Sequence, residues 1–549
     1  MGSRLRLLIL VPWLLAAQPT GTRARIGFDT IHASNMRANL TFLASDALEG
    51  RLSLTRGSEV AIQWIASEFA KAGLKPIADG TFLQPVPLIE YRTDREATSL
   101  IVEQGGVKRT LHFPDAYGNF PSSITISGPV VFAGFGITAP ELHYDDYAGI
   151  DARGAIVLVF DHEPQENDPK SIFNGTGNTR YATSRVKLLN AQRHGALALM
   201  AVAEPDRKHP SNQERVARIA GTQQRTARIA PEVLEGDEVG IPLFTVSDQV
   251  AADLLAPAGK RPSELQGSID RDLHSASLRI PDTLVEIHVV TRERRRAASA
   301  NVIGLIEGSD PALKAETIVY SAHYDHDGPA ANGGYYHGAD DNGSGTVGVV
   351  ELAHAFAANP VKPRRSILFA VFAAEERGLL GSYYYTQHPL RPLTTTRAVI
   401  NFDMIGRNER PSEQTKGLIE IAADTSNELN LIGAKYSPGY RAVVEQANRG
   451  IGLKLNYKWD DESALNVFFR SDQFPFVLHD IPALWWFTGF HPDYHQVTDT
   501  VDKINFAKME KIVRLAYLAG WTFADGSPPP RFIANPAASQ PVPGNPTSR

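Results

Sequence analysis

Residues 366–376 read Ser-Ile-Leu-Phe-Ala-Val-Phe-Ala-Ala-Glu-Glu, an apolar run that ends in two adjacent carboxylates, Glu375 and Glu376. The length and apolar content of the run are typical of a fully buried strand. Two neighbouring carboxylates at the end of such a strand repel each other unless cations lie beside them. One glutamate as a metal ligand and the other as the base for a metal-bound water would resolve that conflict. In isolation, the same pair is more often the polar start of a helix.

Each of three further apolar runs is followed by a side chain that can bind a metal: His323, Asp403 and His495. A fourth such side chain, Asp341, opens the loop Asp-Asn-Gly-Ser-Gly ahead of an apolar helix predicted at 346–358. Open α/β sheets bind their ligands at the carboxyl ends of the strands. The pattern therefore predicts an α/β fold with a metal site at one edge of its sheet.

Two histidines, two aspartates and one glutamate can together hold two zinc-like ions and leave the second glutamate as a base. Asp341 can bridge both ions, because each of its oxygens can bind one. Asp403 would complete the ligand set of the first ion together with His323, and His495 would complete the ligand set of the second. The alternative for Asp341 is a solvated carboxylate beside a helix that Ser344 caps. Oxygen and nitrogen ligands without sulfur also admit cobalt or manganese.

Further polar side chains lie near these positions in the sequence. Asp325 comes two residues after His323 and can orient that ring by accepting a hydrogen bond from its other nitrogen. Tyr494 can donate a hydrogen bond to a developing oxyanion, or it can be an aromatic plug. Three more histidines are interpreted as lining of the site: His326, His337 and His491.

The composition excludes several classes of function. The chain has 549 residues, too many for one ordinary core, so at least two domains are expected. Its formal net charge of -6 gives no electrostatic case for binding nucleic acid, which requires a basic face. Cysteine is absent, which excludes a cysteine nucleophile and a thiolate metal site.

Both ends of the chain are predicted to lie outside the folded part. Arg4 and Arg6 precede the apolar run 7–17, which is too short to span a bilayer and is followed by small residues. This layout is typical of a cleavable signal peptide, predicted at 1–24, with an uncleaved anchor as the alternative. The mature protein is therefore expected to be secreted or periplasmic, with no membrane span. The tail 526–549, rich in Pro, Ala, Ser and Asn, is predicted to be disordered.

The rest of the chain divides into segments that differ in their hydrophobic periodicity and in their Gly and Pro content. The segment 25–115 begins with the helical spacing of two amphipathic helices within 35–74. Short strands with Gly and Pro punctuation follow, and they carry none of the metal-type residues. We interpret 116–275 as an inserted β-rich module and 276–525 as the resumed α/β domain that carries the site.

Six stretches of the second half carry a resemblance to a known family. They are Ser321-Ala-His-Tyr-Asp-His, Gly338-Ala-Asp-Asp-Asn-Gly-Ser-Gly, Ala373-Ala-Glu-Glu-Arg-Gly, Asn401-Phe-Asp-Met-Ile-Gly-Arg, Arg470-Ser-Asp and His491-Pro-Asp-Tyr-His. On these motifs the chain resembles the secreted co-catalytic di-zinc aminopeptidases, relatives of glutamate carboxypeptidase, transferrin receptor and the glutaminyl cyclases. The inserted module is similar to a protease-associated domain, especially in Asp151-Ala-Arg-Gly-Ala-Ile-Val-Leu-Val.

The resemblance implies a fold and a set of metal ligands. The fold is a mixed, largely parallel sheet of about eight strands between helices, and the cofactors are two zinc ions. One zinc would be held by His323 and Asp403, the other by Glu376 and His495, with Asp341 bridging both.

The resemblance also implies roles for three further residues. Glu375 would be the general base, Asp325 would support a histidine ligand, and Tyr494 matches a tyrosine that some members use on the tetrahedral intermediate. Two positions depart from the family pattern. Gln473 stands where several relatives have histidine, and His337 stands where asparagine is common; neither change removes a ligand.

The predicted function is that of an exported zinc aminopeptidase, which removes the first residue from peptides with a free amino terminus. A water that bridges the metals would be activated by Glu375. One alternative is a carboxypeptidase or dipeptidase of the same fold, in which Arg407 and Arg470 are candidates to bind the substrate carboxylate. Another is a surface binding protein without catalysis, which the loss of a ligand would have favoured. The sequence does not predict the oligomeric state.

Overall fold

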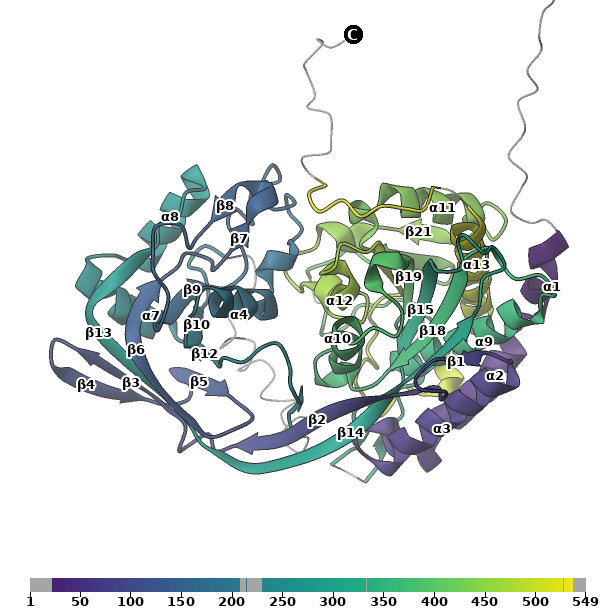
Figure 1. Ribbon diagram of the computed structural model, residues 1–549, viewed down its shortest axis with the longest axis horizontal. Helices are drawn as coiled ribbons and strands as arrows, with labels where there is room; N and C mark the ends of the chain where they lie inside the picture. The colour runs from purple at the N-terminus through teal and green to yellow at the C-terminus, as the bar shows by residue number, and fades with distance from the viewer. Residues whose placement is uncertain are drawn as a thin grey trace, which may run out of the picture.

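The computed structural model describes residues 22–207, 214, 230–331, 333–415, 417–526 and 528–536. This part of the chain forms two lobes that are joined by a pair of long strands (Figure 1). One lobe contains a large mixed sheet with helices, and the other contains a smaller sheet. The predicted signal segment 1–24 lies outside the described residues except for its last three positions, which begin α1 (Thr22–Thr30).

The large sheet contains ten strands: β1 (Lys75–Pro76), β2 (Leu83–Thr93), β11 (Glu232–Leu234), β14 (Thr291–Ile306), β15 (Thr317–His323), β18 (Ser366–Phe372), β19 (Thr396–Phe402), β20 (Glu428–Ile432), β21 (Lys454–Asn456) and β22 (Ala483–Phe487). Their order is β11-β2-β14-β18-β15-β19-β22-β20-β21, and β1 pairs with β14. β1 and β11 have only two and three residues, and β1 lies off this path; the other eight strands make up the rest of the sheet. The prediction of a mixed eight-stranded α/β fold is confirmed.

The centre of this sheet brings the predicted site residues to one edge. Strands β18, β15, β19 and β22 are parallel neighbours and are buried along their length except at Arg397 of β19, as their apolar sequences predict. Because they are parallel, their carboxyl ends meet at the same edge. His323 is the last residue of β15, and Asp403 directly follows β19.

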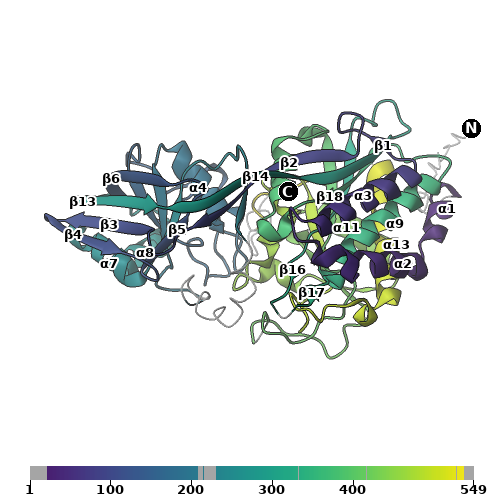
Figure 2. The same cartoon turned by 90° about the horizontal axis from the view of Figure 1, so that it is seen from below.

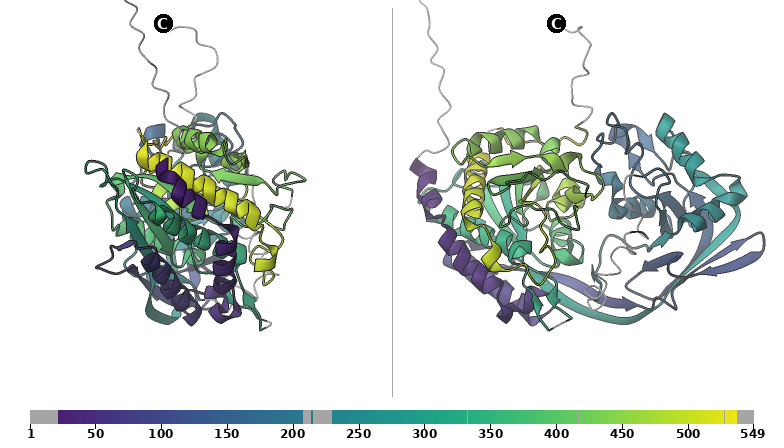
Figure 3. Two further views of the ribbon diagram at one scale, coloured as in Figure 1. Left: turned by 90° about the vertical axis from the view of Figure 1, so that its right-hand side faces the viewer. Right: turned by 180° about the vertical axis from the view of Figure 1, so that it is seen from behind.

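Helices cover both faces of the large sheet, namely α2 (Ala33–Leu43), α3 (Arg56–Lys71), α9 (Gly345–Ala358), α10 (Leu380–Gln387), α11 (Pro438–Asn448), α12 (Phe474–Val477) and α13 (Phe506–Asp525). α9 and α13 pack against β15 and β19, and α10 and α12 lie on the other side of the strands (Figure 1). In the end-on view, the purple N-terminal helices lie beside the yellow α13 (Figure 3, left). Over the described stretch, no helix combines the length and apolar character that crossing a bilayer requires.

The two predicted amphipathic helices within 35–74 are confirmed as α2 and α3. Met36, Leu40 and Leu43 recur at helical spacing on α2, and all three are buried in the core of the large lobe.

The smaller sheet has its own order, β4-β3-β13-β6-β9-β10-β12-β5. Its strands are β3 (Ser99–Gln104), β4 (Val107–Leu111), β5 (Ala116–Asn119), β6 (Ile124–Phe132), β9 (Ile156–Phe160), β10 (Ala198–Val202), β12 (Leu243–Val246) and β13 (Leu278–Val289). The helix α4 (Ser184–Arg193) packs against β10, and α7 (Asp248–Leu255) packs against β13 and α8 (Pro262–Asp272). Two separate apolar clusters fill this lobe.

The boundaries of the smaller lobe differ from the predicted insert 116–275. β3 and β4 come before it and β13 comes after it, so the predicted segments 25–115 and 276–525 both contribute strands to this lobe. The difference arises because β13 pairs with β3 and β6, and long-range pairing cannot be read from local alternation. In the opposite sense, β11 lies within the predicted insert but pairs with β2 at the edge of the large sheet.

The two lobes are connected by a β-arm and by direct polar contacts. β2 and β14 pair along the arm, and β13 carries it into the smaller lobe (Figure 2). Where the lobes face each other, Asn174 Nδ2 donates to the Tyr436 hydroxyl at 2.9 Å, and Arg180 Nη1 is 2.8 Å from Asp480 Oδ1. These contacts fix the smaller lobe beside the edge of the large one.

Part of the C-terminal tail is folded, so the prediction that 526–549 is disordered is wrong for 528–536. The Phe532 ring stacks on Tyr436 with centroids 5.6 Å apart, and the Ile533 amide donates to the Tyr436 carbonyl at 2.8 Å. The composition of the tail gave no sign of this aromatic partner. Residues 537–549 lie outside the described residues.

We expect Gly520→Ala in α13 to lower the free energy of unfolding by about 1–3 kcal/mol, because it overpacks the contact with β15. An added Cβ would lie 1.7 Å from the hydroxyl oxygen of Tyr320, which donates to the Ala516 carbonyl at 2.8 Å. Gly267→Ala in α8 is the control, since its Cβ meets nothing within 4 Å. Thermal unfolding that gives both variants the same melting temperature would contradict this packing.

Candidate functional site

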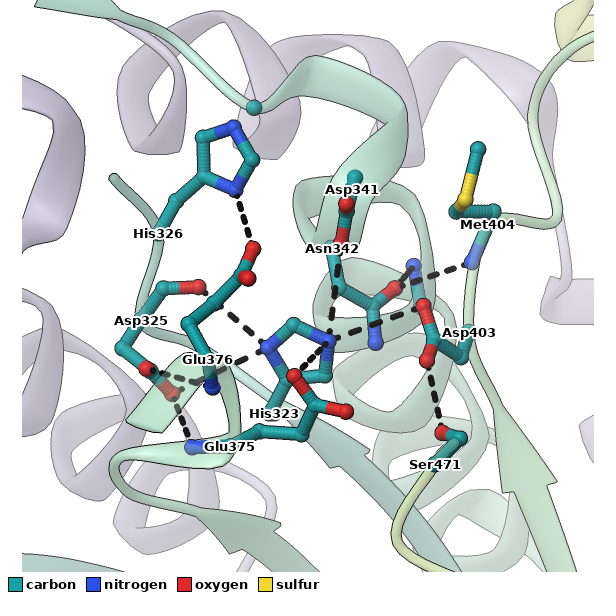
Figure 4. A network of polar contacts seen from close by, with 12 residues as sticks. His323, Asp325, His326, Asp341, Asn342, Glu375, Glu376, Asp403, Met404 and Ser471 are labelled. Carbon is teal, nitrogen blue, oxygen red and sulfur yellow. Dashed lines mark hydrogen bonds and ion pairs between the residues drawn. The ribbon is translucent and has the colours of Figure 1, made fainter. Parts of the chain in front are cut away.

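All eight predicted site residues line or surround one pocket at the carboxyl ends of the central strands. All of them except Tyr494 and His495 are labelled in Figure 4. They come from five separate parts of the chain: the end of β15, the loop before α9, the turn after β18, the end of β19 and the segment after β22. The set is His323, Asp325, Asp341, Glu375, Glu376, Asp403, Tyr494 and His495.

Asp341 lies between the two histidines. Its Oδ1 is 3.6 Å from His323 Nε2, and its Oδ2 is 3.0 Å from His495 Nε2. The loop is fixed from behind, because the amides of Asp340 and Asp341 donate to Asp499 Oδ2 at 2.9 and 3.2 Å. One carboxylate thus presents one oxygen to each imidazole, which is the arrangement that a bridging ligand requires.

His323, Asp341 and Asp403 form a first group, with ligand atoms that all lie within 4.8 Å of one another. Asp403 Oδ1 is 3.5 Å from His323 Nε2. Ser471 Oγ donates to the other oxygen of Asp403 at 2.6 Å, which leaves Oδ1 directed at the histidine. Three buried side chains therefore point their lone pairs at one position.

Glu376 and His495 form a second group on the other side of Asp341. Glu376 Oε2 is 3.5 Å from His495 Nε2, and its Oε1 is 2.7 Å from His326 Nδ1. His326, Asp341 and Glu376 could also hold an ion together, as could Asp327, Glu376 and His495. His326 was interpreted only as lining, but its buried ring hydrogen-bonds one of the candidate ligands. The sequence places His326 in a loop, and a loop position does not predict the orientation of the ring.

Glu375 faces the first group without being part of it. Its Oε2 is 3.6 Å from His323 Nε2, and it lines the pocket. Ala374, with a φ of 52°, reverses the chain directly after β18, so that Glu375 and Glu376 reach different groups. Burial raises the pKa of Glu375 well above its usual range.

Asp325 ties the end of β15 to the glutamate turn. Its carboxylate accepts the amides of Glu375 and Glu376 at 3.0 and 3.2 Å, and it lies 3.7 Å from His323 Nδ1 (Figure 4). The same ring nitrogen is 3.2 Å from the Asp325 carbonyl oxygen. A proton on Nδ1 is therefore held there, and Nε2 is left free to bind a metal.

The remaining predicted lining residues contact other parts of the loops. His491 Nε2 is 3.2 Å from Asp340 Oδ2, and His337 Nε2 is 2.8 Å from Asp46 Oδ1. Asp340 also accepts the Gly406 amide at 2.7 Å, so it points away from the two groups.

Arg51 is a supporting residue that the sequence did not reveal. Its side chain is fully buried and donates to the carbonyls of Leu43, Tyr324, His337 and Gly338 at 2.7 to 2.9 Å. Three of these carbonyls, those of Tyr324, His337 and Gly338, lie in the chain between His323 and Asp341. Burial lowers the pKa of Arg51 to about 10, against the pull of nearby carboxylates, so it remains charged at neutral pH. The only sequence signal was an arginine in a turn.

The charges of the site fit bound cations. Burial raises the pKa of Asp403, while burial opposes charge on His323 and the carboxylates around it raise its pKa well above the usual range. The same holds for His495, whose pKa is raised chiefly by Glu376. Metal ions can replace such protons, because metal ligands bind in their deprotonated form. Imidazole nitrogens and carboxylate oxygens are also ligands that zinc accepts.

The two groups line a pocket of about 370 Å³. Its apolar wall contains Leu379, Met404, Phe469, Trp485 and Phe490, and its polar wall includes Arg377, Arg470 and Tyr494. Arg407, the other predicted carboxylate-binding candidate, instead pairs with Asp493 at 2.7 Å and is absent from the pocket lining.

Comparison with known proteins gives one family and several relatives. Residues 301–519 match the model of Peptidase family M28. The chain is 28% identical over 223 residues to Aminopeptidase YwaD of Bacillus subtilis, covering 39% of this chain and 42% of that protein. It is 26% identical over 233 residues to Leupeptin-inactivating enzyme 1 of Streptomyces exfoliatus, covering 38% and 48%. The chain thus spans less than half the length of these curated relatives.

Solved structures include similar chains. The aminopeptidase from Aneurinibacillus sp. strain AM-1 aligns with 94% of this chain and 97% of its own, at 18% identity and a TM-score of 0.48. The zinc aminopeptidase BSAP from Bacillus subtilis aligns with 92% and 97%, at 19% identity and a TM-score of 0.43.

We expect Arg51→Met to lower the free energy of unfolding by about 3–5 kcal/mol, because it leaves several buried carbonyls without their charged donor. Arg56→Met is the matched control: Arg56 is exposed at the start of α3, and its loss should leave the melting temperature unchanged. Differential scanning calorimetry compares the two variants. A wild-type melting temperature for Arg51→Met would contradict the anchoring role of Arg51.

Proposed function

We propose that this chain, whose residues 301–519 match the model of Peptidase family M28, is a di-zinc exopeptidase that acts as an aminopeptidase. The position of Asp341 supports the proposal most directly, since its two oxygens face the two imidazoles at 3.6 and 3.0 Å. Zinc would be held by His323, Asp341 and Asp403 on one side and by Asp341, Glu376 and His495 on the other. When bound, zinc lowers the pKa of a water molecule and polarises the carbonyl under attack.

Glu375 is the general base of the proposed reaction. It lines the pocket beside the first group but is not needed as a ligand there. It takes a proton from the attacking water and gives it to the leaving amine nitrogen as the peptide C–N bond breaks. Burial of this carboxyl group keeps the transferred proton out of bulk water between the two steps.

Tyr494 stabilises the oxyanion in this proposal. Arg470 Nη2 lies 3.4 Å from the Tyr494 hydroxyl oxygen and donates to it, which leaves the tyrosine proton for a substrate oxygen. A hydrogen bond to the developing negative charge lowers the barrier only if the donor is already in place. The Tyr494 ring lies against Phe490 and His495, with centroid distances of 5.0 and 4.1 Å, and these contacts hold its orientation.

The pocket suits an amino-terminal residue with an apolar side chain. The carboxylates of Glu375 and Glu376 attract a cationic amino group. Trp485 supplies part of the apolar wall, and its Nε1 donates to the Asp403 carbonyl at 2.8 Å, which fixes the indole. Trp486, the next residue in β22, faces the core instead, where its Nε1 is 3.2 Å from the Tyr440 hydroxyl.

A carboxypeptidase or dipeptidase is the second candidate, and the position of Arg470 favours it. Arg470 lines the pocket and could bind a substrate carboxylate. Its contact with Tyr494 gives it another role, and the acidic lining around the metal groups favours an amine over a carboxylate. We therefore rank the aminopeptidase first.

Export and a protease-associated role for the smaller lobe are part of the proposal. Arg4, Arg6 and the apolar run 7–17 support cleavage of a signal peptide and a secreted or periplasmic location. Expression with this segment should give a mature protein in the periplasm or medium whose first residue, read by N-terminal sequencing, lies near residue 25. Full-length protein retained in the membrane fraction would indicate the uncleaved anchor.

We expect Glu375→Gln to lower kcat on leucine p-nitroanilide by about 10²–10⁴-fold, because it removes the base and leaves every proposed ligand. The zinc content, measured by atomic absorption, should stay at two ions per chain. Glu59→Gln on the exposed side of α3 is the control and should retain full activity. An active Glu375→Gln variant would exclude Glu375 as the base.

The N-acetylated substrate separates the two candidate functions. An aminopeptidase should cleave leucine p-nitroanilide and leave N-acetyl-leucine p-nitroanilide intact, because the blocked nitrogen carries no charge. Release of the carboxyl-terminal residue from an N-blocked dipeptide by the zinc-loaded protein would instead support a carboxypeptidase. In that case the free-amine substrate should be a poor one.

A further inference from the structure

Asp327 contacts the imidazole of His495, although it is not one of the five proposed zinc ligands. Its Oδ2 is 2.9 Å from His495 Nδ1, the ring nitrogen opposite the one that faces Asp341 and Glu376. If His495 binds a metal through Nε2, its Nδ1 carries the proton and donates it to Asp327. The aspartate thereby selects the tautomer and the ring orientation.

The other oxygen of Asp327 is bound to the glutamate turn. Arg377 Nη2 donates to Asp327 Oδ1 at 3.1 Å, and Arg377 directly follows Glu376 in the same short turn. Asp327 and Arg377 are both largely buried, with side chains 3% and 11% exposed. A charge-assisted hydrogen bond in such surroundings is stronger than one in water.

These contacts connect the two segments of the chain that carry the second group. Glu376 and His495 lie far apart in the sequence, on a turn after β18 and on a segment after β22. Asp327 joins them, since one of its oxygens binds the residue next to Glu376 and the other binds His495 itself.

His495 depends on such support more than His323 does. His323 ends a buried central strand, whereas His495 lies outside regular structure, with a left-handed φ of 52° and a side chain that is 14% exposed. A non-glycine residue in this backbone region persists only where its surroundings hold it. The second group is therefore the one in which a lost contact should displace a ligand.

We propose that Asp327, held by Arg377, is a positioning residue that keeps Glu376 and His495 oriented toward the same metal position. Its loss should selectively lower the affinity for the second metal ion. This inference rests on the proposed di-zinc function. It assigns Asp327 the same task for His495 that Asp325 has for His323, and it makes the Arg377–Asp327 pair part of the metal centre.

The test is zinc binding by Asp327→Asn, measured by competition with a chromophoric chelator after the purified full chain has been stripped of metal. Asparagine keeps the size of the side chain but offers one acceptor oxygen, so it can serve His495 or Arg377 and not both. We expect the second zinc to bind about 10–100-fold more weakly, the usual effect of losing such a partner, while the first keeps its wild-type affinity.

Two further variants separate positioning from general damage. Asp327→Glu keeps both acceptor oxygens and should recover part of the lost affinity. Ser471→Ala removes the hydroxyl that donates to Asp403 at 2.6 Å, and it should weaken the first zinc instead of the second. If Asp327→Asn does not fold, Arg377→Lys is measured in its place, with a smaller loss expected at the same ion.

The possible results are distinct. Two wild-type zinc affinities in Asp327→Asn would overturn the inference, and so would an equal loss at both ions. A wild-type protein that binds two zinc ions and cleaves the free-amine substrate, with an unaffected Asp327→Asn, would refute only the positioning role. A wild-type protein that binds a single zinc would refute the di-zinc function on which the inference rests.

Discussion

Repulsion among carboxylates that the fold buries at one sheet edge is the constraint on which the rest of the structure depends. Asp341 is flanked by two imidazoles, at 3.6 and 3.0 Å from its two oxygens, and Glu375, Asp403 and Glu376 also lie 3.5–3.6 Å from these rings. Such a site is stable only if positive charge, as protons or as metal ions, lies between its members. The chain meets this constraint with elements from both halves of its sequence. The parallel strands bring His323 and Asp403 to one edge, and the N-terminal segment adds the buried cation Arg51 behind the loops that carry the ligands.

Each candidate ligand is held by a second polar side chain, and these partners set which atom faces the metal position. Asp325 lies at Nδ1 of His323, and Asp327 lies at Nδ1 of His495, so that both rings turn Nε2 inward. His326 occupies one oxygen of Glu376 and thereby turns the other toward His495. The outer contacts also connect strands and loops that are distant in the sequence, so metal binding and folding of this edge depend on each other.

The sequence predicted the large sheet and its ligands because both follow local rules. A buried parallel strand appears as an apolar run, and a polar residue at its end identifies the site, as with His323 and Asp403. Contacts between segments that are distant in the sequence leave no such local pattern. Asp327 and His495 are in contact although they are 168 positions apart in the sequence. Residues 278–289 were predicted to belong to the α/β domain, but the pairing of β13 with β3 places them in the smaller lobe. Arg51 and Phe532 were missed for the same reason: their partners lie far away in the sequence, and neither stands in a periodic segment.

The most direct test of the central claim is anomalous diffraction at the zinc absorption edge from crystals of the zinc-loaded protein. Two ions that share Asp341 should give two peaks, one on each side of its carboxylate, each about 2.0–2.2 Å from one of its oxygens. One peak should also contact His323 and Asp403, and the other Glu376 and His495. A single peak, or two peaks that do not share Asp341, would contradict the account of this site as a bridged pair.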